Sequence, residues 1–216
     1  MSVSLTHEAE LWDAGLPVVA GIDEVGRGAL AGPVSVGVVA VTRCDSWPEG
    51  LTDSKLLSAA RREALIAPLA EFGVARAVGH ASSVEIDAIG IVAALRLAAR
   101  RALDAMDLEI DAVLLDGTHD WLTPPPADLF SDDAEEWAAP PVTMVVKGDR
   151  ACASIAAASV LAKVERDALM AAAHAEHPVY AWDSNKGYGA ASHLDALREH
   201  GPSPLHRVSW KLPFRA

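Results

Sequence analysis

The sequence has 216 residues, which is enough for one domain with a well-packed hydrophobic core. Half of the residues are hydrophobic and 22% are charged, and no apolar run approaches the roughly 18 residues that a membrane-spanning helix needs. The first residues lack the basic start and apolar stretch of a signal peptide, and Cys44 and Cys152 lack CxxC spacing. These features exclude an integral membrane protein and a disulfide scaffold, and they predict a reduced, cytoplasmic protein.

The net charge is −12, which by itself argues against a nucleic-acid partner because phosphate binding requires a local excess of cations. The acidity is concentrated in residues 104–136, which contain 11 acidic residues and no Lys or Arg. Residues 137–216 contain 9 basic and 7 acidic residues, so the last third of the chain can present a basic surface. The net charge therefore does not decide which partner the protein binds.

The first half of the chain predicts three strands and a helix. Apolar runs at 17–23 and 33–42 predict strands, and their short glycine-rich connection leaves no room for a helical crossover, so we expect antiparallel neighbours. An alanine-rich segment from Leu57 to Phe72 predicts a helix, which Pro68 is expected to bend or end early. A third strand is predicted over 73–81.

The second half adds two strands and more helices. Ser82 and Glu85 have the spacing of a capping box, which predicts the start of a helix. The remaining elements are predicted from apolar runs, helical composition and breakers: strands at 111–117 and 142–146, helices at 150–175 and 192–200, and an acidic, Pro-rich insertion at 118–140. This order predicts a single α/β domain over 1–216 with a mixed five-stranded sheet flanked by helices.

Acidic residues stand at the ends of three predicted strands, as Asp23-Glu24, Asp116 and Asp149. Catalytic groups in open α/β sheets collect at the carboxyl ends of strands, and carboxylates gathered there repel one another unless a cation lies between them. Oxygen ligands suit Mg²⁺ or Mn²⁺, and two such ions about 4 Å apart are a common device for phosphodiester cleavage. The alternative is that each acid only shapes a turn or caps a helix. Neighbouring strand residues point to opposite faces, so Asp23 and Glu24 can face one metal only if the strand breaks between them.

Gly26-Arg27-Gly28 follows the first acidic pair. It is not a dinucleotide fingerprint, because a strand follows where a helix should begin, and no GK[ST] marks a phosphate-binding loop. Glycines permit close approach of the backbone to a ligand, and the arginine can meet a phosphate. A tight turn with a solvated arginine is the alternative.

Other polar residues on the predicted C-terminal helices are weaker candidates. Asp167 is a rival for a metal position, although an ion pair on an exposed helix face is the simpler interpretation. Lys163 and Arg166 share a helix face that either meets DNA phosphate or faces solvent. Three histidines are candidates for lining a nucleic-acid groove: His193, His200 and His206.

Six motifs, taken in order, resemble those of the bacterial type 2 ribonucleases H, the ribonuclease HII family. They are GIDEVGRGALAGPV (21–34), TDSKLLS (52–58), VLLDG (113–117), VVKGD (145–149), ASIAAASVLAKVERD (153–167) and NKGYG (185–189). The resemblance spans residues 17 to 210 and implies a ribonuclease H-like fold, with a core over 17–170 and a C-terminal helical extension over 171–216. The insertion at 118–140 is longer and more acidic than the family's usual link.

The resemblance implies an endoribonuclease that hydrolyses the RNA strand of RNA–DNA hybrids. It also implies incision 5′ to single ribonucleotides in duplex DNA, which leaves 3′-hydroxyl and 5′-phosphate ends and uses two Mg²⁺ or Mn²⁺ ions. The implied metal ligands and catalytic residues are four carboxylates: Asp23, Glu24, Asp116 and Asp149. No heptad run demands an oligomer, so we expect a monomer that binds nucleic acid and no membrane.

The resemblance also implies substrate contacts by six residues: Gly26, Arg27, Gly28, Ser54, Lys55 and Tyr188. Arg27, with the backbone of its two glycines, matches the element that senses the 2′-hydroxyl, the group by which proteins distinguish RNA from DNA. Tyr188 matches the aromatic residue that stacks on the deoxyribose after the ribonucleotide. Ala190 stands where family members often have a hydroxyl residue, which leaves one substrate contact in doubt.

Two other functions fit the same residues. A DNA-directed nuclease or resolvase with two metals would still cut a duplex that lacks the 2′-hydroxyl. A module that only binds hybrids, with structural acids, would keep its binding and its metal affinity after Asp116→Asn or Asp149→Asn.

Overall fold

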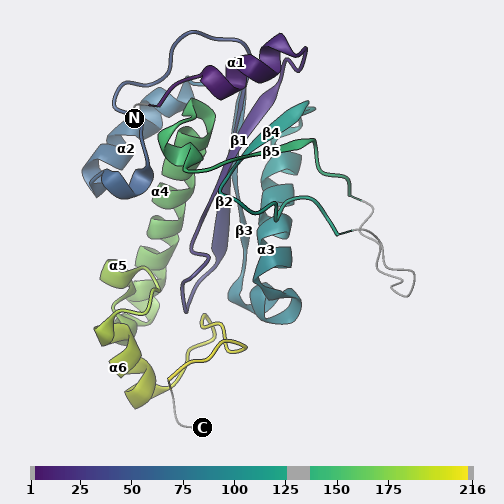
Figure 1. The fold of residues 1–216 in the computed structure, drawn as a ribbon. Helices are drawn as coiled ribbons and strands as arrows, with labels where there is room; N and C mark the ends of the chain where they lie inside the picture. Colours follow the sequence, from purple (N-terminus) through teal and green to yellow (C-terminus); the bar gives the residue numbers. More distant parts are fainter. Residues whose placement is uncertain (1–2, 126–136, 214–216) are drawn as a thin grey trace.

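A five-stranded sheet in the order β3-β2-β1-β4-β5 forms the centre of the protein (Figure 1). The structure is a computed structural model that describes residues 3–125 and 137–213. The strands have these bounds: β1 Val19–Val25, β2 Val34–Val41, β3 Ala75–Ala81, β4 Ala112–Asp116 and β5 Val142–Val145. β2 is antiparallel to β1 and β3, whereas β4 is parallel to β1 and β5. The predicted mixed five-stranded sheet and its antiparallel first pair are confirmed.

Helices cover both faces of the sheet. Their bounds are α1 Thr6–Asp13, α2 Ala59–Ala70, α3 Ser83–Met106, α4 Ala153–Glu176, α5 Trp182–Asn185 and α6 Ala191–His200. The residues of α4 share one hydrophobic cluster with α1 and α2, and α3 forms a second cluster on the opposite face. Beyond α4, helices α5 and α6 form the helical C-terminal region, away from α1 and α2 (Figure 1).

Glycines in the sheet let α4 lie directly on β1 and β2. A Cβ on Gly21 would lie 2.3 Å from the carbonyl carbon of Ser154, and one on Gly37 would lie 2.2 Å from the carbonyl oxygen of Ala158. No other residue fits at either position without moving the helix. Because side chains two residues apart in a strand share a face, Asp23 points to the same side as Gly21, toward α4.

The helix predictions agree with the structure at most boundaries. Ser82 and Glu85 form the predicted capping box at the start of α3. Pro68 lies inside α2, which continues only to Ala70. Helix α1 is not predicted from the sequence, and the side chain that attaches it, Glu8, accepts hydrogen bonds from the amide and hydroxyl of Ser154 at the start of α4.

The described parts of the 118–140 insertion are anchored to the core. Trp121 and Leu122 are buried, and Arg96 donates a hydrogen bond to the carbonyl of Leu122 at 3.1 Å. Residues 126–136, the middle of the insertion, lie outside the described residues. The expected boundary between core and extension at residues 170 and 171 falls inside α4, which crosses it as one continuous helix. Within residues 3–125 and 137–213, no helix has the length and apolarity to span a membrane.

Candidate active site

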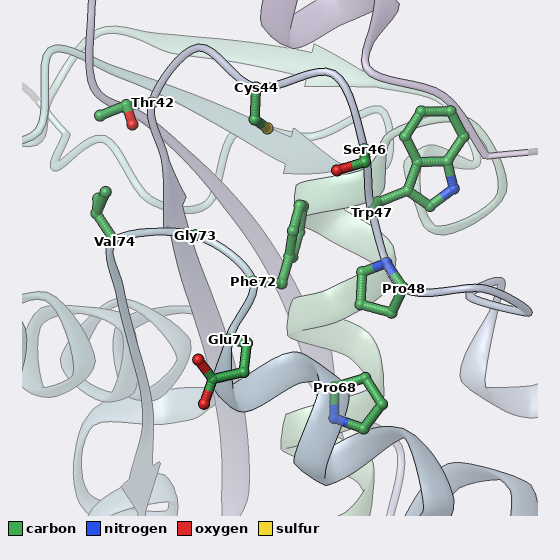
Figure 2. Close-up of a pocket in the computed structure, with 10 residues that line it drawn as sticks. All are labelled: Thr42, Cys44, Ser46, Trp47, Pro48, Pro68, Glu71, Phe72, Gly73 and Val74. Carbon is green, nitrogen blue, oxygen red and sulfur yellow. The ribbon is translucent and has the colours of Figure 1, made fainter.

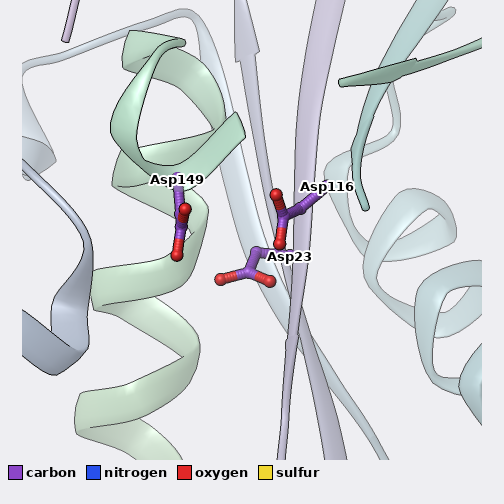
Figure 3. Close-up of side chains that lie close together, drawn as sticks. All are labelled: Asp23, Asp116 and Asp149. Atoms are coloured by element: carbon purple, nitrogen blue, oxygen red, sulfur yellow. The ribbon is translucent and has the colours of Figure 1, made fainter. Parts of the chain in front are cut away.

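Three aspartates meet at the carboxyl ends of β1 and β4 (Figure 3). The register of this parallel pair carries Asp23 and Asp116 to neighbouring positions. Asp149 joins them from η2 (Gly148–Arg150), a short 3-10 helix that follows β5. One carboxylate oxygen of each aspartate lies within 4.8 Å of the other two. We call Asp23, Asp116 and Asp149 the aspartate trio.

Glu24 does not belong to the aspartate trio. β1 continues through Glu24 to Val25 without a break, so the Glu24 side chain leaves the strand on the face opposite to Asp23. Its carboxylate lies 3.6 Å from the guanidinium of Arg27. Burial raises the pKa of Glu24, while the charge of Arg27 lowers it and that of Asp116 raises it. Glu24 is therefore within electrostatic range of the trio but approaches from the other side.

Burial and mutual repulsion disfavour the ionised state of the aspartate trio. Burial raises the pKa of Asp23 to about 8, against a hydrogen bond from Ser159 that lowers it, and the charges of Glu24 and Asp116 add to the rise. Burial and the charge of Asp116 likewise raise the pKa of Asp149 to about 6. A divalent cation would relieve this repulsion, and a set of carboxylate oxygens suits Mg²⁺ or Mn²⁺. The residues present therefore fit a divalent metal ion.

Lys55 brings a positive charge toward the aspartate trio. Partial burial opposes its charge, but the carboxylates of Asp23 and Asp53 raise the pKa of Lys55 above its usual range. Asp53 accepts a hydrogen bond from the Lys55 amide at 2.8 Å and another from the Arg150 guanidinium at 2.9 Å. Asp53 thus joins the turn that carries Lys55 to the turn that carries Asp149.

Ser54 lies beneath this turn and not at the surface. Its side chain is buried, and its hydroxyl is 2.8 Å from that of Ser159 on α4. Its carbonyl accepts a hydrogen bond from Arg62. The 3-10 turn at Ser54–Leu56 directs the hydroxyl into the protein, which differs from the expectation that Ser54 itself contacts substrate.

The Gly26-Arg27-Gly28 segment begins at the end of β1, next to the carboxylates. Gly26 has φ +85°, and a Cβ there would lie 2.0 Å from Nε of Arg166, so both the backbone and the packing require glycine. Gly28 is different, because a Cβ there would meet nothing within 4 Å. Arg27 and Gly28 are exposed. The segment is therefore fixed at one end and open at the other.

Tyr188 lies against this segment although it is 162 residues away in the sequence. Its hydroxyl accepts a hydrogen bond from the amide of Gly26 at 3.1 Å. The residue is 38% exposed, and the guanidinium carbon of Arg166 is 5.5 Å from the centroid of its ring. The structure therefore places Tyr188 against Gly26, at the start of the segment that carries Arg27.

Several weaker candidates have structural roles. Asp167 accepts a hydrogen bond from Lys163 at 2.6 Å and lies 3.7 Å from Arg62, so the ion-pair interpretation holds. His193 and His206 are buried and hydrogen-bonded to each other at 3.0 Å, so they do not line an open groove. The face shared by Lys163 and Arg166 is not solvated at Arg166, which is fully buried.

A separate cavity lies at the other end of the sheet (Figure 2). It has a volume of about 480 Å³ and is lined by the segment after β2, including Cys44 and Trp47, and by Phe72 after α2. Because β2 is antiparallel to β1, the end of β2 lies beside the start of β1 and not beside Asp23. The cavity therefore takes no part in the site around the aspartate trio.

Comparisons with known proteins show which family the chain resembles. The family model described as Ribonuclease HII matches residues 20–213. The ribonuclease HII of Streptomyces avermitilis is 50% identical over 196 residues, which cover 91% of this chain and 78% of the relative. That of Salinibacter ruber is 44% identical over 208 residues, which cover 96% and 98%. The solved structure of a PCNA–RNase HII complex from Archaeoglobus fulgidus matches with a TM-score of 0.67 and 26% identity, over 90% of this chain and 96% of that chain.

The matched range contains the aspartate trio, the Gly26-Arg27-Gly28 segment and Tyr188. Both the family model and the relatives extend over most of the chain, so the likeness includes the sheet and the helical C-terminal region together. The chain therefore belongs to the ribonuclease HII family, metal-dependent endoribonucleases that act on RNA–DNA hybrids.

Proposed function

We propose that this protein incises duplex DNA on the 5′ side of a single embedded ribonucleotide, in addition to cutting the RNA strand of hybrids, and leaves 3′-hydroxyl and 5′-phosphate ends. The observation that supports this proposal is the continuity of β1 with the segment that follows it. The strand carries Asp23 into the aspartate trio, and three residues later it delivers Gly26 against Tyr188. A group that handles a phosphodiester and a group that can read the neighbouring sugar thus lie three residues apart on one continuous segment.

In this proposal the aspartate trio holds the metal, and Glu24 completes the set of four carboxylates from the opposite face of β1. Two divalent ions, Mg²⁺ or Mn²⁺, would supply an activated water and stabilise the leaving 3′-oxygen. Lys55 balances the charge of the trio and is suited to meet a substrate phosphate beside it. Ser54 contributes by supporting the turn of Lys55 from below.

In this proposal the exposed part of the glycine-flanked segment, Arg27 and Gly28, recognises the ribonucleotide. The exposed backbone of Gly28 leaves space for a sugar to approach, and the Arg27 guanidinium, tethered to Glu24, can meet the adjacent phosphate. The amide of Gly26 is already occupied by the Tyr188 hydroxyl, which holds the exposed ring in place to stack on the next deoxyribose. A 2′-hydroxyl both donates and accepts hydrogen bonds, so backbone groups suffice to detect it.

We infer that the protein works as a monomer in the cytoplasm, where DNA carrying misincorporated ribonucleotides is accessible. Its partner in this proposal is the nucleic acid itself. No protein partner is needed to complete the site, since every proposed contact belongs to one chain.

The test uses a labelled duplex with one internal ribonucleotide and a matched all-DNA duplex, each with Mg²⁺, Mn²⁺ or a chelator. We expect one metal-dependent cut, 5′ to the ribonucleotide, with the control intact. Cleavage of both duplexes would keep the metal site but refute sugar recognition, as in a DNA-directed nuclease. Cleavage of neither by folded protein, together with tight binding of hybrid, would favour the binding module.

A further inference from the structure

Two arginines lie completely buried beneath the loop formed by residues 26–33, which we call the recognition loop. Arg207 comes from the segment after α6 and Arg166 from α4, and neither has an exposed side chain. Within the described residues, the oxygen atoms that accept hydrogen bonds from these guanidiniums all belong to backbone carbonyls. A buried cation satisfied by carbonyl dipoles orders the backbone that supplies them.

Arg207 binds the two ends of the recognition loop. Its guanidinium donates to the carbonyls of Gly26 at 2.7 Å and Arg27 at 2.9 Å, and to that of Gly32 at 3.1 and 3.2 Å. It also lies over the ring of Trp210, with 4.8 Å between the guanidinium carbon and the ring centroid. Burial and the charge of Arg166 lower the pKa of Arg207 to about 10, so the side chain stays protonated at neutral pH.

Arg166 binds the remaining part of the loop and the segment before Tyr188. It donates to the carbonyls of Pro33 at 2.9 Å, Ala31 at 3.2 Å and Lys186 at 2.9 Å. The same guanidinium lies over the Tyr188 ring and occupies the space that a side chain at position 26 would need. Arg166 therefore connects the recognition loop to the aromatic residue opposite it.

The two arginines determine which backbone groups of the loop stay available. Carbonyls of five residues accept hydrogen bonds from them: Gly26, Arg27, Ala31, Gly32 and Pro33. Most amides of the loop also have acceptors within the protein. Among the described residues, the amides of Arg27 and Gly28 have none, and both residues are exposed. These five carbonyls are thus turned inward, and two adjacent hydrogen-bond donors are left for a ligand.

We propose that Arg207 and Arg166 are positioning residues for ribonucleotide recognition, which act by holding the recognition loop so that the Arg27 and Gly28 amides are free to bind substrate. This inference rests on the proposed function of the loop. It gives the segment after α6 a role in substrate selection, because Arg207 belongs to that segment. Neither arginine contacts the substrate or the aspartate trio in this arrangement.

The test compares Arg207→Lys with the parent protein on the duplex that carries one ribonucleotide. Lysine keeps the charge, but its single ammonium group cannot span carbonyls at both ends of the loop. We expect KM to rise about tenfold to a hundredfold, as for a misplaced recognition element, with kcat changed by less than about threefold. The apparent Mn²⁺ affinity should be unchanged, because the aspartate trio is untouched.

Arg96→Lys is the matched control, since Arg96 is another buried arginine that donates to backbone carbonyls, those of Leu122 and Thr123. It should show a similar loss of thermal stability with the parent KM. Arg166→Lys is the second variant and should reproduce the rise in KM. An unchanged KM in folded Arg207→Lys would overturn the inference, and so would failure of both lysine variants to fold, which would assign the arginines to the fold alone. If the parent cuts the all-DNA duplex equally well, the proposed function fails and the inference falls with it.

Discussion

The aspartate trio and the recognition loop handle buried charge in opposite ways. In the trio, three like charges converge, and burial together with repulsion raises the pKa of two of them. Beneath the loop, two like charges also lie close together, but each guanidinium is surrounded by carbonyl oxygens of the protein. The trio needs a cation from outside, whereas the loop is complete without one.

The aspartate trio therefore depends on a bound ion, whereas the recognition loop depends only on contacts within the protein. A site whose charges are unbalanced has high affinity for the missing ion, and its state depends on pH and on metal concentration. A loop whose carbonyls are held by buried guanidiniums keeps one conformation under all these conditions. The predictions below therefore change the charge or protonation of the aspartate trio, and the packing or hydrogen bonds of the recognition loop.

The largest effect is expected from Asp116→Asn. The amide oxygen can still accept the hydrogen bond from Gly148, which measures 2.7 Å to Asp116, but a negative charge at the metal site is lost. Cleavage should fall by about a thousandfold or more, equivalent to several kcal/mol of transition-state stabilisation. In chelator, thermal unfolding should show a variant at least as stable as the parent, because repulsion with Asp23 and Asp149 is reduced. Activity near the parental value would contradict the assignment.

The second largest effect is expected in the pH dependence of the affinity for metal. Asp23 and Asp149, with pKa values of about 8 and about 6, hold protons that a divalent cation must displace. The apparent Kd for Mn²⁺ should fall as pH rises from 5 to 8, by about tenfold per pH unit for each proton released. Calorimetric titration measures it, and Asp23→Asn should flatten the dependence.

The unfolding free energy of the metal-free protein should fall as pH rises over the same range, whereas the affinity for Mn²⁺ rises. The folded state keeps protons on Asp23 and Asp149 that the unfolded state releases near the ordinary pKa of 3.8, so this contribution is present at low pH. It is lost as pH rises through about 6 and then about 8. Melting curves in chelator should show a falling Tm, and a Tm that rises across this window would refute the raised pKa values.

A smaller effect is expected from Gly26→Ala. The positive φ of Gly26 and the position of Arg166 oppose any side chain there, so the variant should lose about 1–3 kcal/mol of unfolding free energy. Gly28→Ala is the control for stability, because a Cβ at Gly28 meets nothing within 4 Å. Urea unfolding should give a lower midpoint for Gly26→Ala than for Gly28→Ala. Equal midpoints would contradict the conclusion that packing requires glycine at position 26 but not at position 28.

The smallest effect is expected from Tyr188→Phe, which keeps the ring and removes one hydrogen-bond acceptor. The Gly26 amide loses its partner, at a cost of about 1 kcal/mol, so cleavage of the ribonucleotide duplex should fall only a few-fold. Steady-state kinetics measure the change. A loss as large as that of Asp116→Asn would mean that the Tyr188 hydroxyl itself takes part in the reaction.

Local patterns in the sequence were sufficient to predict the sheet and the acids at its edge. Strand ends and helix caps depend on neighbouring residues, so Asp116 and the Ser82 capping box could be located from the sequence alone. The direction of the Glu24 side chain could not be predicted, because it depended on whether β1 breaks between Asp23 and Glu24. Periodicity placed Arg166 on a face of α4 but did not show that the recognition loop covers that face. Helix α1 was missed because Glu8 finds its partner, Ser154, 146 residues later.

The attachment of the recognition loop to Arg207 also orders events during synthesis. Asp23, Asp116 and Asp149 all leave the ribosome before Arg207, which follows Arg27 by 180 residues. A nascent chain therefore has every aspartate of the trio while its loop still lacks one of the two arginines that shape it. In the proposed arrangement, the aspartates that hold the metal are therefore translated before the loop proposed to select the substrate acquires its contacts with Arg207.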